Sequence, residues 1–389
     1  MASKKNISTK KLYGQFMTTN YEYILKNMFI PDNVKNIIEP FAGNCDLIKF
    51  IKNKDLYNIE YYDIEPKKDF IIHRDTLNNP PIYENKFVLT NPPYLARNKS
   101  NDKIIFEKYD ENDLYKCFIR ELIINNPVGG IIIIPLNFWS SIRKNDIELR
   151  KDFLNKFKVL LINIFEENVF EDTSYSVCSF QFVKKDDIIE KNQSFSVDSS
   201  LFSGVSTKEN TEKNQSFSVD SSPCSKENSN TIKINIYPSL KEMEIELNEK
   251  NDYIIGGHIY KLPRKNKYKI ERLTKKNKNN KNTNILVKCL DDNSESKISM
   301  SIVPDKDVFI DNTPNLSART YASLIITPSI NMEEQKKLVL NFNKLLNEYR
   351  IEYNSLFLTN YRESKDIARK RISFDLIYNI TEYILDTSS

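Results

Sequence analysis

The sequence is poor in the residues that most often hold metals or cross-links. It has only 2 histidines and 5 cysteines among 389 residues. The cysteines stand at 45, 117, 178, 224 and 289, and none forms a closely spaced pair. This pattern fits neither a structural zinc site nor a disulfide framework. We therefore expect no metal site and a reducing, intracellular setting, which for this chain means the cytoplasm.

Long apolar runs are also absent. The longest candidate, residues 131–136, has the length of a strand and is far short of the roughly 18 residues that a membrane helix needs. The first ten residues, MASKKNISTK, contain lysines, but no apolar segment follows them. This is unlike a secretory signal. We expect no membrane partner. Glycine is scarce, with 7 in all, so each one that is kept marks a place where the backbone needs it.

Strand-like and helix-like stretches alternate between residues 36 and 184. The expected strands are 36–41, 58–64, 70–75, 86–90, 129–136, 159–165 and 176–183, and the expected helices are 45–54, 113–125 and 146–157. Apolar strands separated by helices indicate an α/β domain with a mostly parallel sheet of seven strands. The last two strands are separated by about ten residues, which favours an antiparallel pair.

The rest of the chain divides at a low-complexity segment. Residues 185–230 are rich in Ser, Asn, Lys and Glu, and EKNQSFSVDSS occurs there twice, at 190–200 and 212–222. We interpret them as a disordered insertion. The predicted domains are 1–184, which carries the chemistry, and 231–389, an α+β domain. The latter has short strand-like pieces at 231–237, 252–262, 298–303 and 321–327 and helices at 332–349 and 363–385. The apolar stripe of the last helix is expected to be core.

Polar residues follow four of the expected strands in the first domain. Glu39, Pro40 and Phe41 follow the first strand, and the next three end at Asp63, Asp75 and Asn91. In open α/β sheets, ligands bind beyond the carboxyl ends of the strands. The candidate site is therefore expected at this edge of the sheet.

The most informative motif is Asn91-Pro92-Pro93-Tyr94. The two prolines stiffen the backbone and remove two N–H groups, while the Asn91 side chain and the Pro92 carbonyl supply acceptors. A planar amino group is a poor nucleophile, and acceptors on both of its N–H bonds favour the pyramidal, reactive form. Tyr94 would offer an aromatic face for a base. The alternative is a plain proline turn.

A second motif lies about 50 residues upstream, at residues 39–46. Gly43 allows the chain to bend between a strand and a helix, and the backbone amides at that helix start could meet the methionine part of a cofactor. Asp63 is placed to accept from two ribose hydroxyls. The loop is not GxGxxG, which argues against a phosphate-bearing cofactor.

The order of these motifs resembles that of the gamma group of amino-methylating DNA methyltransferases, the NPPY-bearing type associated with type II restriction-modification. The likeness covers roughly residues 12–184. In addition to the motifs above, Phe16 and Thr18 resemble the N-terminal motif, with Thr19 where the family has proline. Asp75 resembles the acid that holds the adenine of the cofactor, and Phe170 resembles an aromatic residue that holds the target base.

The resemblance implies a Rossmann-like fold that binds S-adenosylmethionine. It also implies methyl transfer to N6 of an adenine flipped out of double-stranded DNA, with residues 231–389 as the target recognition domain. The implied catalytic residues are Asn91, Pro92, Pro93, Tyr94 and Phe170. Those implied to bind the cofactor are Phe16, Thr18, Glu39, Pro40, Phe41, Gly43, Asp63 and Asp75. A cognate restriction endonuclease is a candidate partner, and monomer and dimer both stay open.

Charge distribution favours a nucleic acid. Residues 258–288 hold eleven Lys or Arg and one acid, Glu271, which is typical of a phosphate-binding surface or of a solvated loop. The alternatives are N4-cytosine methylation, an RNA or protein-glutamine methyltransferase, a DNA-binding protein with an inactive methyltransferase fold, and a fused endonuclease. For the last, VPDKD at 303–307 is more simply a surface turn.

Overall fold

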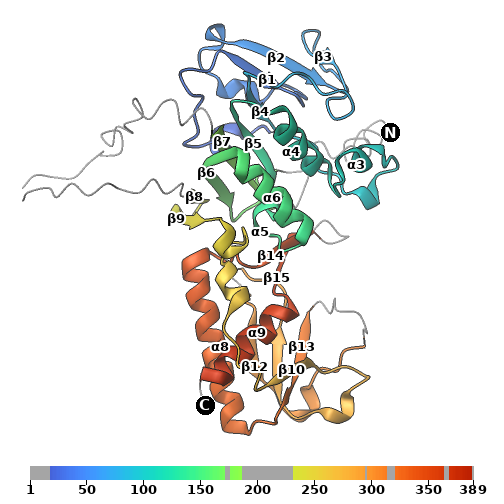
Figure 1. The fold of residues 1–389 in the computed structure, drawn as a ribbon, viewed down its shortest axis with the longest axis vertical. Coiled ribbons are helices and arrows are strands. Elements are labelled where there is room, and N and C mark those ends of the chain that lie inside the picture. Colours follow the sequence, from blue (N-terminus) through green and yellow to red (C-terminus); the bar gives the residue numbers. More distant parts are fainter. Residues whose placement is uncertain are drawn as a thin grey trace, which may run out of the picture.

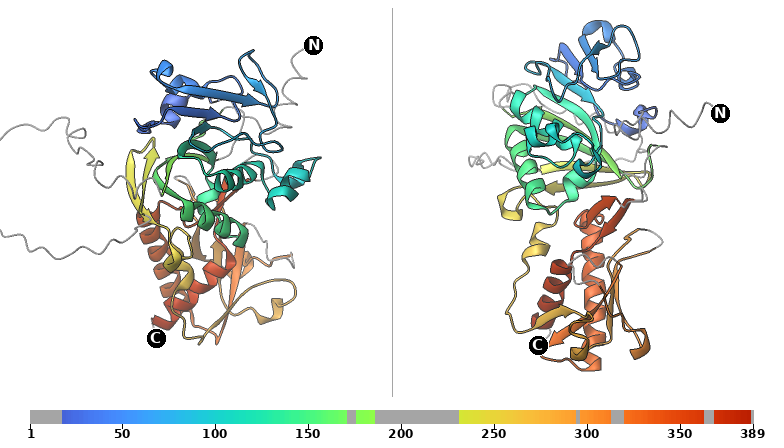
Figure 2. Two further views of the ribbon diagram at one scale, coloured as in Figure 1. Left: turned by 45° about the horizontal axis from the view of Figure 1, so that its top comes forward. Right: turned by 90° about the vertical axis from the view of Figure 1, so that its right-hand side faces the viewer.

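A computed structural model describes residues 18–170, 176–185, 231–293, 296–312, 320–362 and 368–387. Two lobes follow one another along the long axis of the molecule (Figure 1). In both views of Figure 2 the yellow segment after strand β9 runs from the first lobe into the second. Phe16 and nearly all of the predicted 185–230 insertion lie outside the described residues.

The first lobe is built on a nine-stranded sheet with the order β3-β2-β1-β4-β5-β7-β6-β8-β9. Its strands are β1 (Asn36–Glu39), β2 (Asn58–Asp63), β3 (Ile72–His73), β4 (Phe87–Thr90), β5 (Gly129–Pro135), β6 (Phe157–Phe165), β7 (Val177–Lys184), β8 (Thr231–Tyr237) and β9 (Lys241–Glu246). Strands β1 to β5 pair in parallel, and β7 is antiparallel to both β5 and β6. The order β3-β2-β1-β4-β5 matches the first five strands of the Rossmann order. The predicted Rossmann-like α/β fold and the antiparallel pair are confirmed, but the sheet has nine strands instead of the predicted seven, because β8 and β9 join it.

Both faces of this sheet are covered. The helices are α2 (Tyr21–Ile24), α3 (Ile104–Tyr109), α4 (Leu114–Asn125), α5 (Asn137–Ser140) and α6 (Lys144–Lys156). Phe153 of α6 packs edge-on against Phe180 of β7, with ring centroids 5.7 Å apart. Asn163 of β6 donates to the carbonyl of Ile24 in α2 at 3.2 Å. Adjacent strand residues point to opposite faces, and Ser179 next to Phe180 also bonds to Ile24. Helices α2 and α6 therefore lie on opposite faces.

The glycine pair at the start of β5 is explained by close packing. A Cβ atom on Gly129 would lie 2.6 Å from the carbonyl oxygen of Phe182. One on Gly130 would lie 2.7 Å from the carbonyl oxygen of Val88. Only glycine allows neighbouring strands to approach this closely.

Two local predictions in this lobe are wrong in detail. The helix expected at 45–54 is replaced by two short 3₁₀ helices, η1 (Leu47–Phe50) and η2 (Lys54–Leu56). The backbone of Ile51 between them is extended, and a residue in that conformation ends a helix. The strand expected at 70–75 keeps only Ile72 and His73. A third 3₁₀ helix, η3 (Arg97–Lys99), follows the NPPY segment.

The predicted domain boundary at residue 231 falls inside the first lobe. Strand β8 pairs in parallel with β6, from Leu161↔Lys233 to Phe165↔Tyr237. Its apolar residues Ile232, Ile234 and Ile236 are buried in the first core. Local pattern identified the strand but not its sheet, because pairing partners are set by tertiary contacts. The strand expected at 252–262 is also wrong, since 3₁₀ helices η5 (Glu249–Asn251) and η6 (Gly257–Lys261) connect the lobes there.

The second lobe packs two helices on one face of a four-stranded antiparallel sheet, β10-β13-β11-β12. The strands are β10 (Lys269–Arg272), β11 (Ile285–Lys288), β12 (Ser299–Ile302) and β13 (Tyr321–Thr327). The helices are α8 (Met332–Tyr353) and α9 (Phe374–Thr387), with 3₁₀ helices η7 (Lys278–Asn280) and η8 (Asp305–Asp307) in loops. Alternate residues of β13, including Leu324 and Ile326, are buried with Phe342 of α8 and Leu376 of α9.

The last predicted helix begins later than expected. Helix α9 starts at Phe374, because 368–371 forms strand β15 (Ala368–Arg371), which pairs with β14 (Thr359–Arg362). The predicted apolar stripe is core: Ile372, Leu376, Ile377, Ile380 and Ile384 are all buried. Ile367 lies outside the described residues.

A buried arginine joins the first lobe to the connecting segment. Arg150 of α6 is fully buried and donates to the carbonyls of Tyr253 at 2.6 Å, Phe138 at 2.5 Å and Ser141 at 2.9 Å. Burial lowers the pKa of Arg150 to about 10. Strand β14 of the second lobe also packs on α5. None of the helices in the described ranges is long and apolar enough to span a bilayer.

Candidate active site

Asn91 lies at the carboxyl end of β4, a strand whose four residues are all buried. Its side-chain amide donates to the hydroxyl of Thr18 at 3.0 Å. Thr18 is itself buried and comes from the N-terminal motif, 73 residues away in sequence. With this bond the amide nitrogen faces Thr18 and the amide oxygen faces the other way.

The oxygen of Asn91 accepts a hydrogen bond from the hydroxyl of Tyr94. The same hydroxyl lies 2.9 Å from the carbonyl oxygen of Ile133 on the neighbouring strand β5. The Tyr94 ring is only 2% exposed and meets Tyr115 edge-on, with centroids 6.2 Å apart. The expectation that Tyr94 offers an open aromatic face is therefore wrong for this conformation. Phe170 is likewise buried, at 5% exposure.

The NPPY segment is held against the start of α4. Pro92 is buried and Pro93 half-buried. Just beyond Tyr94, the amide of Leu114 donates to the carbonyl of Leu95 at 3.1 Å. The amide of Arg97 donates to the carbonyl of Asn112 at 2.9 Å. These bonds, with an Ala96↔Asp113 bridge, fix the path of the chain after the motif.

The predicted cofactor loop follows β1 and is hydrogen-bonded to the end of β2. Gly43 has φ +51°, the left-handed conformation that glycine adopts without strain. Its amide donates to Asp63 Oδ2 at 2.8 Å, and the amide of Glu65 donates to Asp63 Oδ1 at 2.7 Å. Each carboxylate oxygen keeps a further lone pair. Asp63 can therefore accept additional hydroxyl donors without giving up the bonds that hold it.

Glu39 at the end of β1 is a buried carboxyl group that the protein leaves partly unsatisfied. It is 1% exposed, and its Oε2 has no hydrogen-bond partner among the described residues. Burial raises the pKa of Glu39 well above its ordinary value, and the charges of Asp46 and Asp63 raise it further. Native proteins rarely leave such an atom without a donor. A cationic ligand group at this strand end would satisfy it.

Two more predicted cofactor residues, Pro40 and Phe41, belong to this loop, and Asp75 follows β3. The Pro40 carbonyl accepts from the hydroxyl of Thr76 at 3.1 Å. Phe41 is half-buried and packs edge-on against Phe118, with centroids 5.1 Å apart. Asp75 accepts from the amides of Leu77 at 3.2 Å and Asn78 at 3.1 Å, so its carboxylate already caps a turn.

Asp113 is a residue of this region that the sequence did not single out. It is buried behind the NPPY segment, and its Oδ1 lacks a hydrogen-bond partner among the described residues. Burial raises the pKa of Asp113 to about 7, although Lys116 opposes the shift. An aspartate just before a helix is typical of an N-cap, so no sequence signal distinguishes it.

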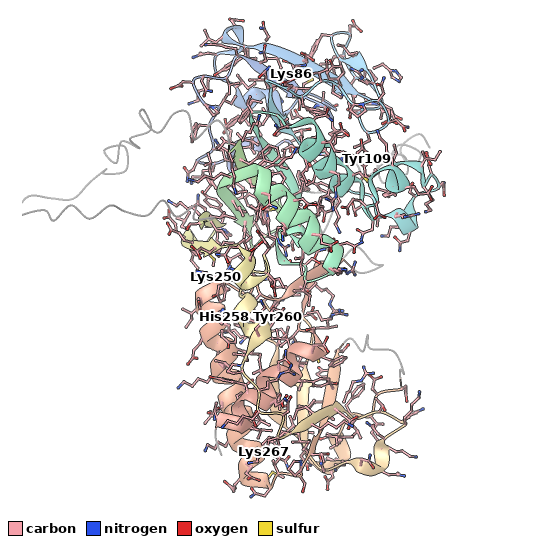
Figure 3. All side chains as sticks on the ribbon, in the orientation of Figure 1. Lys86, Tyr109, Lys250, His258, Tyr260 and Lys267 are labelled. Atoms are coloured by element: carbon pink, nitrogen blue, oxygen red, sulfur yellow. The ribbon has the colours of Figure 1, made fainter. Side chains whose placement is uncertain are left out.

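The basic segment 258–288 does not form one continuous surface. Figure 3 shows His258 at the waist of the molecule and Lys267 at the far end of the second lobe. Five of its cations pair with acids: Lys261–Asp252, Arg264–Glu382, Lys269–Glu271, Arg272–Asp311 and Lys281–Asp305. The positive charge left for a ligand is smaller and more localised than the sequence suggests.

Possible metal ligands are not gathered anywhere in the described part of the chain: no group of three or more His, Cys, Asp or Glu side chains could hold an ion there. Cys45, Cys117, Cys178 and Cys289 are buried and unpaired.

Comparison with known proteins finds likeness in structure alone. No family model matches, and no curated protein matches. Among solved structures, the type I restriction enzyme EcoKI M protein is 14% identical, with a TM-score of 0.34 and coverage of 46% of this chain and 46% of that one. The methyltransferase subunit of the type I restriction-modification system from Streptococcus thermophilus is 10% identical, with a TM-score of 0.35 and coverage of 56% and 44%.

The type IIG restriction endonuclease BpuSI is 13% identical, with a TM-score of 0.35 and coverage of 67% of this chain and 36% of that one. This chain thus spans less than half the length of each of the three structures. At such identities the likeness concerns the fold only. The functional argument for the Rossmann-like lobe therefore comes from its own residues.

Proposed function

We propose that this chain transfers a methyl group from S-adenosylmethionine to N6 of an adenine in double-stranded DNA. The observation that carries the proposal is the arrangement of Asn91. Its side chain is oriented by Thr18 and its oxygen already binds a donor, the Tyr94 hydroxyl. An oriented acceptor at a strand end, next to a loop suited to a cofactor, is what activation of an amino group requires.

The cofactor would be held at the ends of β1 and β2. Asp63 would accept from the ribose hydroxyls while its bonds to Gly43 and Glu65 hold it in place. The unsatisfied oxygen of Glu39 suits the ammonium of the methionine part, because burial makes an opposite charge most effective there. When bound, the cofactor supplies an electrophilic methyl on a sulfonium. Asp75 remains the candidate for contact with its adenine, and Phe41 would be a further cofactor contact from the loop.

Asn91 and Pro92 would bind the two N–H bonds of the target amino group. Two acceptors favour the pyramidal nitrogen and stabilise the positive charge that develops on it during methyl transfer. The proton leaves after the nitrogen becomes cationic, so no general base is needed to start the reaction. Most of the rate enhancement would come from holding the amino group in line with the methyl.

Base binding would require Tyr94 to change its place. Its hydroxyl occupies the Asn91 oxygen, and its ring is buried. A target adenine rotated out of the duplex, at a cost of a few kcal/mol, would take the hydroxyl's place and stack on the Tyr94 ring. Phe170 would lie on the other side of the base.

The second lobe would bind the duplex as the target recognition domain. The resemblance to restriction-modification enzymes makes a cognate endonuclease that cuts the same site a candidate partner. Asn91 at the first motif position favours methylation of adenine N6. Methylation of cytosine N4 is the nearest alternative. RNA and protein glutamine are further alternatives, since each presents an amino group of the same kind.

In vitro methylation with labelled S-adenosylmethionine separates these alternatives. The purified chain is incubated in turn with duplex DNA, with transcribed RNA and with a bacterial protein extract, and the labelled product is digested and identified. Label in N6-methyladenine from the duplex supports the proposal. Label found only in N4-methylcytosine, in RNA or in glutamine assigns one of the alternatives. Cofactor binding with no transfer to any of the three indicates an inactive fold.

A further inference from the structure

An exposed aromatic pair lies on the second lobe, on the face that the helices leave open. Phe309 and Tyr321 have ring centroids 6.4 Å apart and are 38% and 39% exposed. Ile310 beside them is 42% exposed. Ala322 and Leu324 of β13 point into the core with α8 and α9. Tyr321 is the residue directly before Ala322, and adjacent side chains of a strand point to opposite faces. The pair therefore belongs to the opposite face of the sheet.

The lysine-rich loop that follows β10 is bonded to the segment that carries Phe309. Thr274 bridges to Asp311, and the amide of Lys275 donates to the carbonyl of Asp311 at 3.0 Å. In return, the amide of Asp311 donates to the carbonyl of Leu273 at 3.2 Å. Since Asp311 follows Phe309 and Ile310, the loop and the aromatic pair form one surface.

The loop is ordered by its own side chains. Asn277 Oδ1 accepts from the amide of Thr274 at 2.7 Å, and its Nδ2 donates to the carbonyl of Arg272 at 3.1 Å. Arg272 forms a buried ion pair with Asp311 at 2.9 Å. The backbone of a loop held in this way loses little conformational freedom on binding a ligand, which favours affinity.

Three lysines of the loop are available for a ligand. Lys275, Lys276 and Lys278 are exposed, and within the described ranges none of them forms an ion pair. Among the carboxylates of residues 305–311, Asp305 is paired with Lys281 and Asp311 with Arg272, which leaves Asp307. The surface therefore carries a net positive charge next to exposed aromatic rings. That combination suits a polymer with phosphates and flat bases.

Strand pairing places the aromatic pair relative to the first lobe. Strands β10 and β13 lie on the side of the molecule where α3 projects, while α8 lies on the other (Figure 1). Beyond β11, Leu290 bridges to Arg371 of β15, whose partner β14 packs on α5 of the first lobe. Tyr321 pairs with Lys288 at that end of β11, so the aromatic pair lies at the end of the sheet nearer the first lobe.

We infer that Lys275, Lys276 and Lys278 bind phosphates of the substrate duplex and that Phe309 and Tyr321 contact its bases. The inference rests on the proposed function and names the part of the second lobe that meets the DNA. The lysines supply affinity that does not depend on sequence. The aromatic side chains supply contacts at a base step, by stacking or by wedging.

Salt-dependent binding tests the lysines. Affinity of the full chain for a fluorescent duplex is measured over a range of salt concentrations. The triple variant Lys275→Ala, Lys276→Ala, Lys278→Ala is expected to reduce the slope of log affinity against log salt by about 2.7, at about 0.9 for each phosphate contact. The matched control removes three exposed lysines of α8 by Lys336→Ala, Lys337→Ala and Lys344→Ala, and should leave the slope unchanged. Equal changes in both variants, or none in the first, would overturn the inference.

The aromatic pair is tested by Phe309→Ala and Tyr321→Ala. Each should weaken binding about tenfold with no change in the salt slope, whereas Leu340→Ala, which removes an exposed side chain of α8, should have no effect. Unchanged affinity in both aromatic variants contradicts the base contacts.

For every variant, the cofactor affinity is measured by calorimetry and the melting temperature is determined. Values close to those of the wild type show that the fold is intact. Wild-type methylation of DNA combined with an unchanged salt slope in the first triple variant rejects this surface but keeps the function. Salt-dependent loss of duplex binding without any methylation by the wild type keeps the contact and rejects the function.

Discussion

The Tyr94 hydroxyl donates a hydrogen bond to the side-chain oxygen of Asn91, three residues earlier in the same motif. The proposed reaction assigns that oxygen to the amino group of the target base. In the proposed reaction the base would take the position of the Tyr94 hydroxyl, so Tyr94 and the base would compete as donors to this oxygen. Binding of the base and movement of Tyr94 become one coupled event.

Removing only the hydroxyl by Tyr94→Phe should make the base easier to bind. A competing hydrogen bond of about 1 kcal/mol disappears, so the KM for DNA should fall about fivefold while kcat stays close to that of the wild type. Steady-state kinetics on one duplex measures both values. The control Tyr94→Ala removes the ring as well and should lower kcat/KM at least tenfold through loss of stacking. A large rise in KM for Tyr94→Phe would mean that the hydroxyl contacts the substrate directly.

The Asp63 carboxylate should be needed for cofactor binding. In Asp63→Ala the amides of Gly43 and Glu65 lose their acceptor, and hydrogen bonds to a charged group contribute about 1.5–3 kcal/mol. The Kd for S-adenosylmethionine should rise roughly 10- to 100-fold in calorimetry. Asp63→Asn keeps one acceptor oxygen, so its Kd for S-adenosylmethionine should lie between those of the wild type and Asp63→Ala. Wild-type affinity in Asp63→Ala would contradict the cofactor assignment.

Two glycines should respond differently to alanine. At Gly43 a Cβ would meet no atom within 4 Å, so only its positive φ opposes the change, at a cost of about 1 kcal/mol. At Gly130 a Cβ would lie 2.7 Å from the Val88 carbonyl and 2.9 Å from the Phe182 ring, and overpacking of a core costs about 1–3 kcal/mol or more. Urea unfolding should rank Gly130→Ala as the less stable variant, and the reverse order would contradict the packing of β5.

Asp113 should make stability depend on pH. Its pKa is raised from 3.8 to about 7 in the folded protein by burial, so the folded state favours the protonated acid. The stabilisation is complete below the unfolded pKa near 4 and is lost as pH rises towards about 7. The variant Asp113→Asn, which cannot ionise, should gain stability relative to the wild type across this window. Thermal unfolding at pH 4, 5.5, 7 and 8 measures the difference between the two proteins. A difference that stays constant with pH would show that Asp113 is not held in its neutral form.

Most of the first sheet could be predicted because its strands are continuous apolar runs. Strand β5, with all seven residues buried, has a pattern that requires no knowledge of its neighbours. The pattern failed where pairing was decided at a distance. The sequence pattern predicts β8 as a strand. In the structure this strand pairs with β6 of the first lobe and is not part of the second domain. The β15 segment ARKR has no apolar residue besides alanine and forms a hairpin through backbone bonds to β14.

The candidate site was predictable to the extent that it lies at strand ends. Asn91 and Asp63 stand at the carboxyl ends of β4 and β2, where the sequence placed them. The bond between Thr18 and Asn91 and the burial of Tyr94 depend on contacts between distant segments. The neutralising environment of Asp113 arises in the same way, and no local pattern encodes it.

The central claim is tested most directly in cells. The chain and its Asn91→Ala variant are expressed in a host that lacks adenine methylation, and the DNA is digested for nucleoside mass spectrometry. The account predicts N6-methyladenine with the wild type and none with Asn91→Ala, although calorimetry should find similar cofactor affinity in both. Equal N6-methyladenine from the two proteins, or none from a soluble wild type that binds the cofactor, would contradict it.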